Sequence, residues 1–153
     1  YKMMIFKRVF FFILLFALGS CGYEPLYSKK EKFNTAIQSF ELEGDKKLNR
    51  KIASSLGLKN QTDTTGYKLI INSNKTFRAV TKDSAGNTSV YKTQITVKVS
   101  LIDGDKVYKE KTFVSEFTYN NMDNKFDLSQ YQKDIEINLI NKIIEKIFLF
   151  LTL

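Results

Sequence analysis

The clearest pattern in the chain is an alternation of apolar and polar residues between positions 89 and 102. This period of two is typical of a β-strand that is buried on one face only. Similar alternation predicts strands at 67–82 and 107–119, with turn signals at 84–87 and 103–105. We therefore predict three long antiparallel strands with one solvated face. The central strand is predicted to bury Tyr91, Thr93, Ile95, Val97, Val99 and Leu101 and to solvate Lys92, Gln94, Thr96, Lys98 and Ser100.

Upstream of these strands the pattern changes to the four-residue spacing of an amphipathic helix. Leu48, Ile52 and Leu56 would share one face of that helix. Asp45 is suitably placed to be its N-cap, and Gly57 stands where a left-handed C-terminal cap is needed. We therefore predict a helix of about three turns between these two residues.

A second amphipathic helix is predicted near the C-terminal end, after a polar loop at 120–127. Ser129 with Gln132 three residues later matches a capping box, so we expect the helix to run from there to about Phe150. Polar residues precede the apolar end at 148–153 too closely for a membrane span, and we expect a core-packing helix. Its predicted apolar stripe contains Leu128, Tyr131, Ile135, Leu139, Ile143 and Ile147, widened by Ile140, Ile144 and Phe148.

A short first strand is predicted at 36–42, where a β-bulge would reconcile the irregular spacing of Ile37, Phe40 and Leu42. The predicted order of elements is then β-α-β-β-β-α. The economical fold is α+β, with two helices packed on one face of a four-stranded, mainly antiparallel sheet.

The N-terminal segment has a different organisation, in which basic residues precede an apolar run, small residues and a cysteine. Lys2, Lys7 and Arg8 precede the apolar run at 9–17, and residues 18–21 (LGSC) follow it. A helix needs roughly 20 apolar residues to cross a bilayer, so this shorter run favours a cleaved signal over a permanent anchor. The layout is typical of a bacterial lipoprotein signal peptide.

Cys21 is the residue to which this signal directs modification, and it is the only cysteine in the chain. We expect it to become the first mature residue, carrying N-acyl and S-diacylglycerol groups, with no other cofactor. In Gram-negative lipoproteins an aspartate at the next position tends to retain the protein in the inner membrane. Gly22 therefore favours a lipid anchor on the periplasmic side of the outer membrane. Two alternatives are an ordinary signal-flanking cysteine and a buried free cysteine in a cytosolic protein.

Three parts of the chain are predicted: a signal peptide at 1–20, a lipidated tether at 21–35 and a single domain at 36–153. Without its signal the chain has 153 − 20 = 133 residues, which suits one domain with one core. The net charge of +8 falls by the three basic signal residues to +5.

The residues that carry most enzyme chemistry are scarce in this chain. It has no histidine and one cysteine, which leaves no Cys/His metal-ligand set and no Ser-His pair. No glycine-rich phosphate loop is present, and the carboxylates show no suggestive pairing. We therefore expect a protein that is not an enzyme. Its positive charge favours anionic lipid headgroups or phosphorylated glycolipids, and export makes nucleic acid an unexpected partner.

Residues 21–27 (CGYEPLY) resemble the C-G-F-x-P-L-Y start of the lipopolysaccharide-assembly lipoprotein (LptE) family of alphaproteobacteria. The resemblance covers essentially the whole chain and ends with an amphipathic helix. It includes the helix residues Leu48, Arg50, Ile52 and Leu56, the strand start at 67–69 (YKL), the D-G hairpin at 103–104, and 115–120 (SEFTYN), which is similar to S-x-A-S-Y-N.

This resemblance implies a non-enzymatic subunit of the outer-membrane lipopolysaccharide translocon. Members of the family plug a large β-barrel partner of the LptD type, help it to assemble and bind lipopolysaccharide. If such a glycolipid site exists here, its phosphates need fixed cations at the tip or solvated face of the long hairpin. The candidates are Lys75, Arg78, Lys82 and Lys92, with Arg78 first because a guanidinium binds phosphate bidentately. The alternative is that these are ordinary solvated strand-face cations.

Two other functions are compatible with an exported, lipid-anchored binding protein. One is an accessory subunit of another envelope machine, such as barrel assembly or secretion, that binds only protein. The other is a periplasmic carrier for a small lipid. An accessory would co-purify with a different barrel, and a carrier would extract lipid into soluble complexes.

Overall fold

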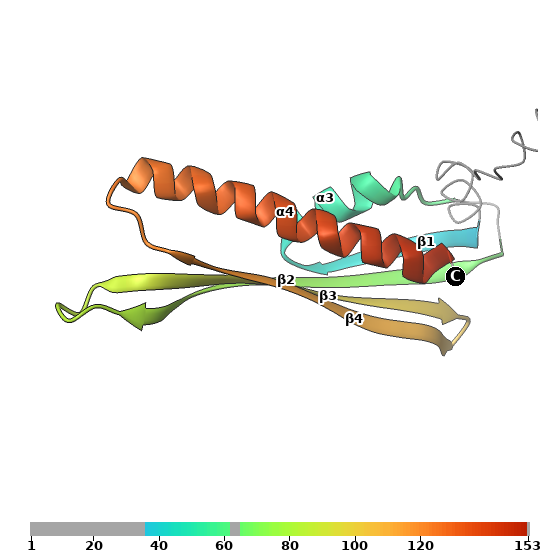
Figure 1. The fold of residues 1–153 in the computed structure, drawn as a ribbon. Helices are drawn as coiled ribbons and strands as arrows, with labels where there is room; N and C mark the ends of the chain where they lie inside the picture. Colours follow the sequence, from blue (N-terminus) through green and yellow to red (C-terminus); the bar gives the residue numbers. More distant parts are fainter. Residues whose placement is uncertain (1–35, 62–64, 153) are drawn as a thin grey trace, which may run out of the picture.

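The elements follow the predicted order β-α-β-β-β-α, in a computed structural model that describes residues 36–61 and 65–152 (Figure 1). The predicted signal peptide, the tether and Cys21 lie outside these described residues. The elements are β1 (Ile37–Gly44), α3 (Lys46–Leu56), β2 (Tyr67–Lys82), β3 (Thr88–Asp103), β4 (Lys106–Asn120) and α4 (Lys125–Thr152).

The four strands form one sheet in the order β1-β2-β3-β4. The pairs β2–β3 and β3–β4 are antiparallel, as expected for strands joined by tight turns. β1 pairs in parallel with β2, because α3 carries the chain back across the sheet before β2 begins. The predicted bulge in the first strand is confirmed by a register shift between Ile37 and Ser39.

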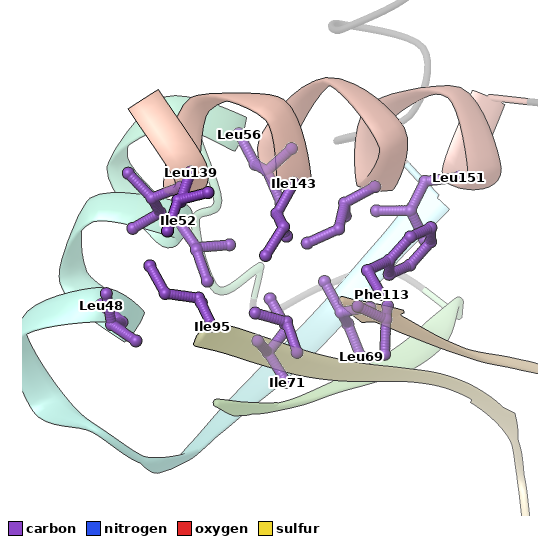
Figure 2. Packing of buried hydrophobic residues seen from close by; sticks show 14 of the residues in the cluster. Leu48, Ile52, Leu56, Leu69, Ile71, Ile95, Phe113, Leu139, Ile143 and Leu151 are labelled. Carbon is purple, nitrogen blue, oxygen red and sulfur yellow. The ribbon is translucent and has the colours of Figure 1, made fainter. Parts of the chain in front are cut away.

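Both helices cover the same face of the sheet, as predicted, and the hydrophobic core lies between these two layers (Figures 1 and 2). The alternation predicted for β3 is confirmed at Thr93, Ile95 and Val97, which are buried, and at Lys98, which is exposed. Ser100 was predicted to be solvated but is buried, and its hydroxyl donates a hydrogen bond of 2.7 Å to the Glu110 carboxylate. The core residues labelled in Figure 2 come from every layer: Leu48, Ile52, Leu56, Leu69, Ile71, Ile95, Phe113, Leu139, Ile143 and Leu151.

Helix α3 has the two caps predicted for it. The Asp45 side chain accepts hydrogen bonds from the backbone N–H groups of Lys47 (2.9 Å) and Leu48 (3.0 Å). Gly57 adopts the left-handed conformation, with φ of 68°, that a C-terminal cap requires. These caps fix the ends of the helix so that its apolar face meets β1 and β2.

Helix α4 begins at Lys125, earlier than predicted. The prediction that Ser129 forms a capping box at its start was wrong. Asn124 is the cap, since its side-chain oxygen accepts hydrogen bonds from the N–H groups of Phe126 (3.0 Å) and Asp127 (3.4 Å). The earlier start places Leu128 inside the helix, where it is buried against the core. Burial of this leucine favours the asparagine over the equally suitable Ser129. Within the described ranges neither helix combines the length and apolarity that a bilayer crossing requires.

The corner between β1 and α3 is built around a close approach of two backbones. Gly44 has φ of 87°, and a Cβ atom at this position would collide with the carbonyl oxygen of Ser73 on β2. That carbonyl accepts a hydrogen bond from the N–H of Asp45 (2.9 Å). The buried Ser73 hydroxyl donates to Asn49 Oδ1 (2.7 Å), and Asn49 Nδ2 donates to the Glu43 carbonyl (2.7 Å). All these polar groups are satisfied, so the corner holds α3 on the sheet.

Replacing Gly44 by alanine should therefore destabilise the domain by about 3 kcal/mol, combining left-handed strain with a backbone collision. Gly86, in the β2–β3 turn, is a matched control, because its φ of 83° is similar but open space surrounds it. Gly86→Ala should cost only about 1–2 kcal/mol, for the strain alone. Urea denaturation followed by circular dichroism measures both, and equal losses would contradict the collision.

Candidate functional site

The sheet face turned away from the helices, here called the open face, is the surface on which the candidate cations were predicted. Its side chains alternate with the core residues and are mostly charged, hydroxyl-bearing or amide-bearing. From β2 to β4 they include Asn72, Asn74, Thr76, Arg78, Lys92, Gln94, Thr96, Lys98, Glu110, Thr112, Glu116 and Thr118. The open face is therefore a broad polar surface that can form hydrogen bonds with a partner.

Cross-strand ion pairs neutralise much of the charge on this face. Lys98 Nζ lies 3.0 Å from Glu110 Oε1, and Ser100 donates a hydrogen bond of 2.7 Å to the other oxygen of that carboxylate. The hydrogen bond from Ser100, followed by that from Lys98, holds the pKa of Glu110 below its ordinary value. At the edge formed by β1, Lys68 Nζ lies 2.7 Å from Glu41 Oε1.

Arg78 and Lys92 are brought together, because they are direct neighbours across the β2–β3 pairing. Two like charges at this spacing repel each other. Glu116 on β4 relieves that repulsion, since its Oε1 lies 2.6 Å from Lys92 Nζ. Within the described residues Arg78 has no hydrogen bond or ion pair from its guanidinium, and it is exposed. Arg78 is therefore the cation of this group that remains open to an anionic ligand.

The other two predicted cations lie elsewhere. Lys82 is exposed at the end of β2, where two register shifts precede the turn at 83–87. Lys75 was expected at the tip or solvated face of the hairpin, and that placement was wrong. It points to the helix-covered side, where its Nζ lies 2.8 Å from Glu136 Oε2 on α4. The two-residue period of β2 explains this position, since Lys75 follows the buried Ile71 and Ser73 on the same side.

Glu136 joins three elements on the helix side through its two lysine partners. Lys47 on α3 lies 3.1 Å from Glu136 Oε1, while Lys75 on β2 contacts the other oxygen. Partial burial raises the pKa of Glu136, but the hydrogen bonds and charges of Lys75 and Lys47 outweigh this, and its pKa is lowered overall. Lys75 is thus engaged in tertiary structure.

An aromatic row at the end of the sheet near the 83–87 turn was missed by sequence reasoning. Phe77 stacks on Tyr91 with ring centroids 5.0 Å apart, and Tyr91 lies 6.0 Å from Tyr119. Tyr119 in turn meets Tyr131 of α4 edge-on at 5.8 Å. The period of two placed Tyr91 and Tyr119 on the core side, but the partial exposure of this end was not predictable from it. Phe77 remains 53% exposed.

Three further lysines, Lys109, Lys111 and Lys146, were also missed as a group. They line a groove between β4 and the C-terminal half of α4. No pattern in the sequence indicated that these positions converge, because the side-by-side placement of an edge strand and a distant helix is a tertiary feature. Within the described ranges, no cluster of three or more His, Cys, Asp or Glu side chains is arranged to hold a metal ion.

These features define a two-layer α+β domain that presents one polar sheet face and a terminal aromatic row. Solved structures of bacterial lipoproteins have the same fold. The minor lipoprotein of Acinetobacter baumannii aligns with a TM-score of 0.60 and 15% identity, over 77% of this chain and 91% of its own. A protein from Caulobacter crescentus assigned as a lipoprotein aligns with a TM-score of 0.57 and 17% identity, over 80% of this chain and 92% of its own.

The rare lipoprotein B of Shewanella oneidensis is also similar, with a TM-score of 0.51 and 12% identity, over 71% of this chain and 92% of its own. At these identities the likeness shows a shared fold. No protein-family model and no curated protein sequence matches the chain. The fold is thus one that lipoproteins of the Gram-negative envelope adopt.

Glu136→Gln should lower the free energy of unfolding by about 1 kcal/mol at pH 7, because two charge-assisted hydrogen bonds are weakened. A carboxylate with a lowered folded pKa stabilises the fold above its unfolded pKa of about 4.3, and that contribution disappears as pH falls through the folded value. The difference between wild type and variant should therefore shrink below about pH 4. Denaturant titrations across pH measure it. Glu145→Gln, an exposed α4 carboxylate, is the control and should change stability little at any pH.

Proposed function

We propose that this chain is an outer-membrane lipoprotein subunit of the lipopolysaccharide translocon, which plugs a β-barrel partner, assists its assembly and binds lipopolysaccharide. The observation that carries the proposal is the combination of the lipoprotein signature at 18–27 with a fold shared by Gram-negative lipoproteins. Neither part is sufficient alone, because the signature says only how the chain is anchored and the fold does not define a ligand.

The open face supports the role of a plug. Large β-barrels of the outer membrane have polar interiors, so a plug must offer polar side chains to the barrel wall. The open face meets this need with hydroxyl, amide and paired charged groups across three strands. We propose that the open face contacts the barrel, and that binding is the function of this domain, with no catalytic step.

The guanidinium of Arg78 is the proposed anchor for a lipopolysaccharide phosphate. It is exposed, has no partner among the described residues, and stands beside Lys92, which adds positive charge although Glu116 is paired with it. A planar guanidinium can bind two phosphate oxygens at once. Lys75 is not part of the proposed site, because its ammonium group forms an ion pair with Glu136. Lys82 is retained as an exposed cation farther along the same hairpin.

Arg78→Glu should weaken binding to purified lipopolysaccharide at least about tenfold, because a charge-assisted contact worth about 1.5–3 kcal/mol is replaced by repulsion. Arg78→Lys should have an intermediate effect, since it keeps the charge but loses the bidentate geometry. Lys133→Glu, which makes the same charge change on an exposed position of α4, is the matched control. Titration of labelled lipopolysaccharide gives the affinities, and unchanged binding by Arg78→Glu would refute the assignment.

The partner is tested by isolating the acylated chain from detergent-solubilised envelopes and identifying the barrel that accompanies it. We expect a lipopolysaccharide-translocating barrel, and labelled palmitate should enter the wild-type chain but not Cys21→Ala. Recovery of a barrel-assembly or secretion component instead would favour the accessory-subunit alternative. Recovery of soluble lipid complexes without a barrel would favour a carrier.

A further inference from the structure

A groove of about 580 Å³ runs between the edge strand β4 and the C-terminal half of α4. Its size is within the range of roughly 300–1,000 Å³ that ligand sites occupy. The groove lies at the β4 edge of the sheet beside α4, and neither Arg78 nor Lys92 lines it, so it is separate from the proposed Arg78 site. Its lining residues are Lys109, Lys111, Thr112, Phe113, Val114, Lys146, Leu149 and Phe150.

The charge around this groove is all of one sign. Three lysines line it from both walls, with Lys109 and Lys111 on β4 and Lys146 on α4, and no carboxylate is among the lining residues. On the open face, by contrast, Lys92 and Lys98 each form an ion pair with a carboxylate. Within the described residues none of the three groove lysines makes an ion pair, so their positive potential is uncompensated.

The floor of the groove is apolar and partly open to solvent. Phe113 and Phe150 meet edge-on with centroids 5.8 Å apart, and Leu149 is 54% exposed. Such exposure is unfavourable unless another apolar group covers it. A ligand that fits both properties has an anionic head and an alkyl chain.

Part of the lysine arrangement serves the fold itself. Lys109 Nζ donates a hydrogen bond of 2.8 Å to the Phe150 carbonyl near the C-terminal end of α4, and it lies 5.0 Å from the Phe150 ring centroid. This position suits the negative end of the helix dipole. The same explanation does not extend to Lys111, whose ammonium lies 5.6 Å from the Phe113 ring centroid. Among the three groove lysines, Lys111 has only this ring contact and Lys146 has no hydrogen bond or ion pair in the described chain, so both ammonium groups are available to an anion.

An extended peptide added to the free edge of β4 is a different occupant, and the strand itself disfavours it. Lys109 and Lys111 project from the edge strand to the helix side, as shown by the contacts of Lys109 with Phe150 and of Lys111 with Phe113. Inward-pointing lysines on an edge strand are a device that opposes the addition of another strand. A compact ligand that reaches the lysines without pairing with the backbone fits better.

We infer that this groove binds an anionic phospholipid, with the phosphate held between Lys111 and Lys146 and an acyl chain along Phe113, Leu149 and Phe150. The inference is independent of the proposed translocon function, because it concerns a different surface and a different ligand. It makes the C-terminal half of α4, together with β4, a lipid-binding part of the domain.

Native mass spectrometry of the full-length chain in detergent, titrated with phosphatidylglycerol or phosphatidylcholine, tests this inference. Lys111→Glu with Lys146→Glu should weaken phosphatidylglycerol binding at least about tenfold, since each cation near a lipid phosphate contributes about 1 kcal/mol. Phosphatidylcholine binding should be weak and unchanged. Lys109 is left intact because it holds the Phe150 carbonyl. The matched control, Lys51→Glu with Lys133→Glu, changes the net charge equally at exposed positions outside the groove and should bind like wild type.

Two further measurements separate the possible outcomes. Leu149→Ser should weaken phosphatidylglycerol binding several-fold without changing binding of glycerol 3-phosphate, whereas equal loss for both would overturn the role of the acyl chain. Arg78→Glu should leave phosphatidylglycerol binding intact, which separates this groove from the open face. Equal loss in the groove and control variants, or binding of a polyglutamate peptide as tight as that of phosphatidylglycerol, would overturn the assignment.

Discussion

The whole domain depends on the packing of one long apolar helix stripe against one face of a twisted sheet. Helix α4 has 28 residues, and its Ile143 and Ile147 are completely buried in the core. Helix α3 completes the cover over the part of the sheet that contains β1. Because every helix in the described chain lies on this side, the opposite face stays open to solvent and carries polar side chains, some of which form cross-strand ion pairs. The division of the molecule into a helix-covered side and a polar, solvent-exposed side follows directly from this arrangement.

The order of the elements and most of their bounds could be predicted from the sequence, because the local capping and periodicity patterns agree with the final fold. The strand at 67–82 coincides with β2, and both caps of α3 were placed on the correct residues. The failure at Ser129 shows the limit of local rules. Both Asn124 and Ser129 are good N-caps, and in the structure it is Asn124 that accepts the capping hydrogen bonds from Phe126 and Asp127. Choosing between them requires knowing where the helix meets the sheet.

The candidate site was less predictable than the fold. The period of two puts Arg78 and Lys92 on the open face, but their direct pairing depends on the β2–β3 register, which the sequence did not predict. The same period puts Lys75 on the helix side, contrary to the expectation for it. Glu136, the partner of Lys75, lies 61 positions away, and no local pattern links the two. The groove lysines present the same difficulty, since Lys111 and Lys146 converge only after α4 has packed alongside β4. Convergence of distant residues is the information that a single sequence does not display.

The tight turns that connect β2, β3 and β4 also have a consequence for how the chain reaches this structure. All the hydrogen bonds of this three-stranded meander join segments that are neighbours in sequence, so the meander can form without waiting for a distant part of the chain. The pairing of β1 with β2 instead requires closing a loop that contains α3, which carries a larger entropic cost. The described chain thus has a local nucleus, on which its first strand and both helices can assemble afterwards.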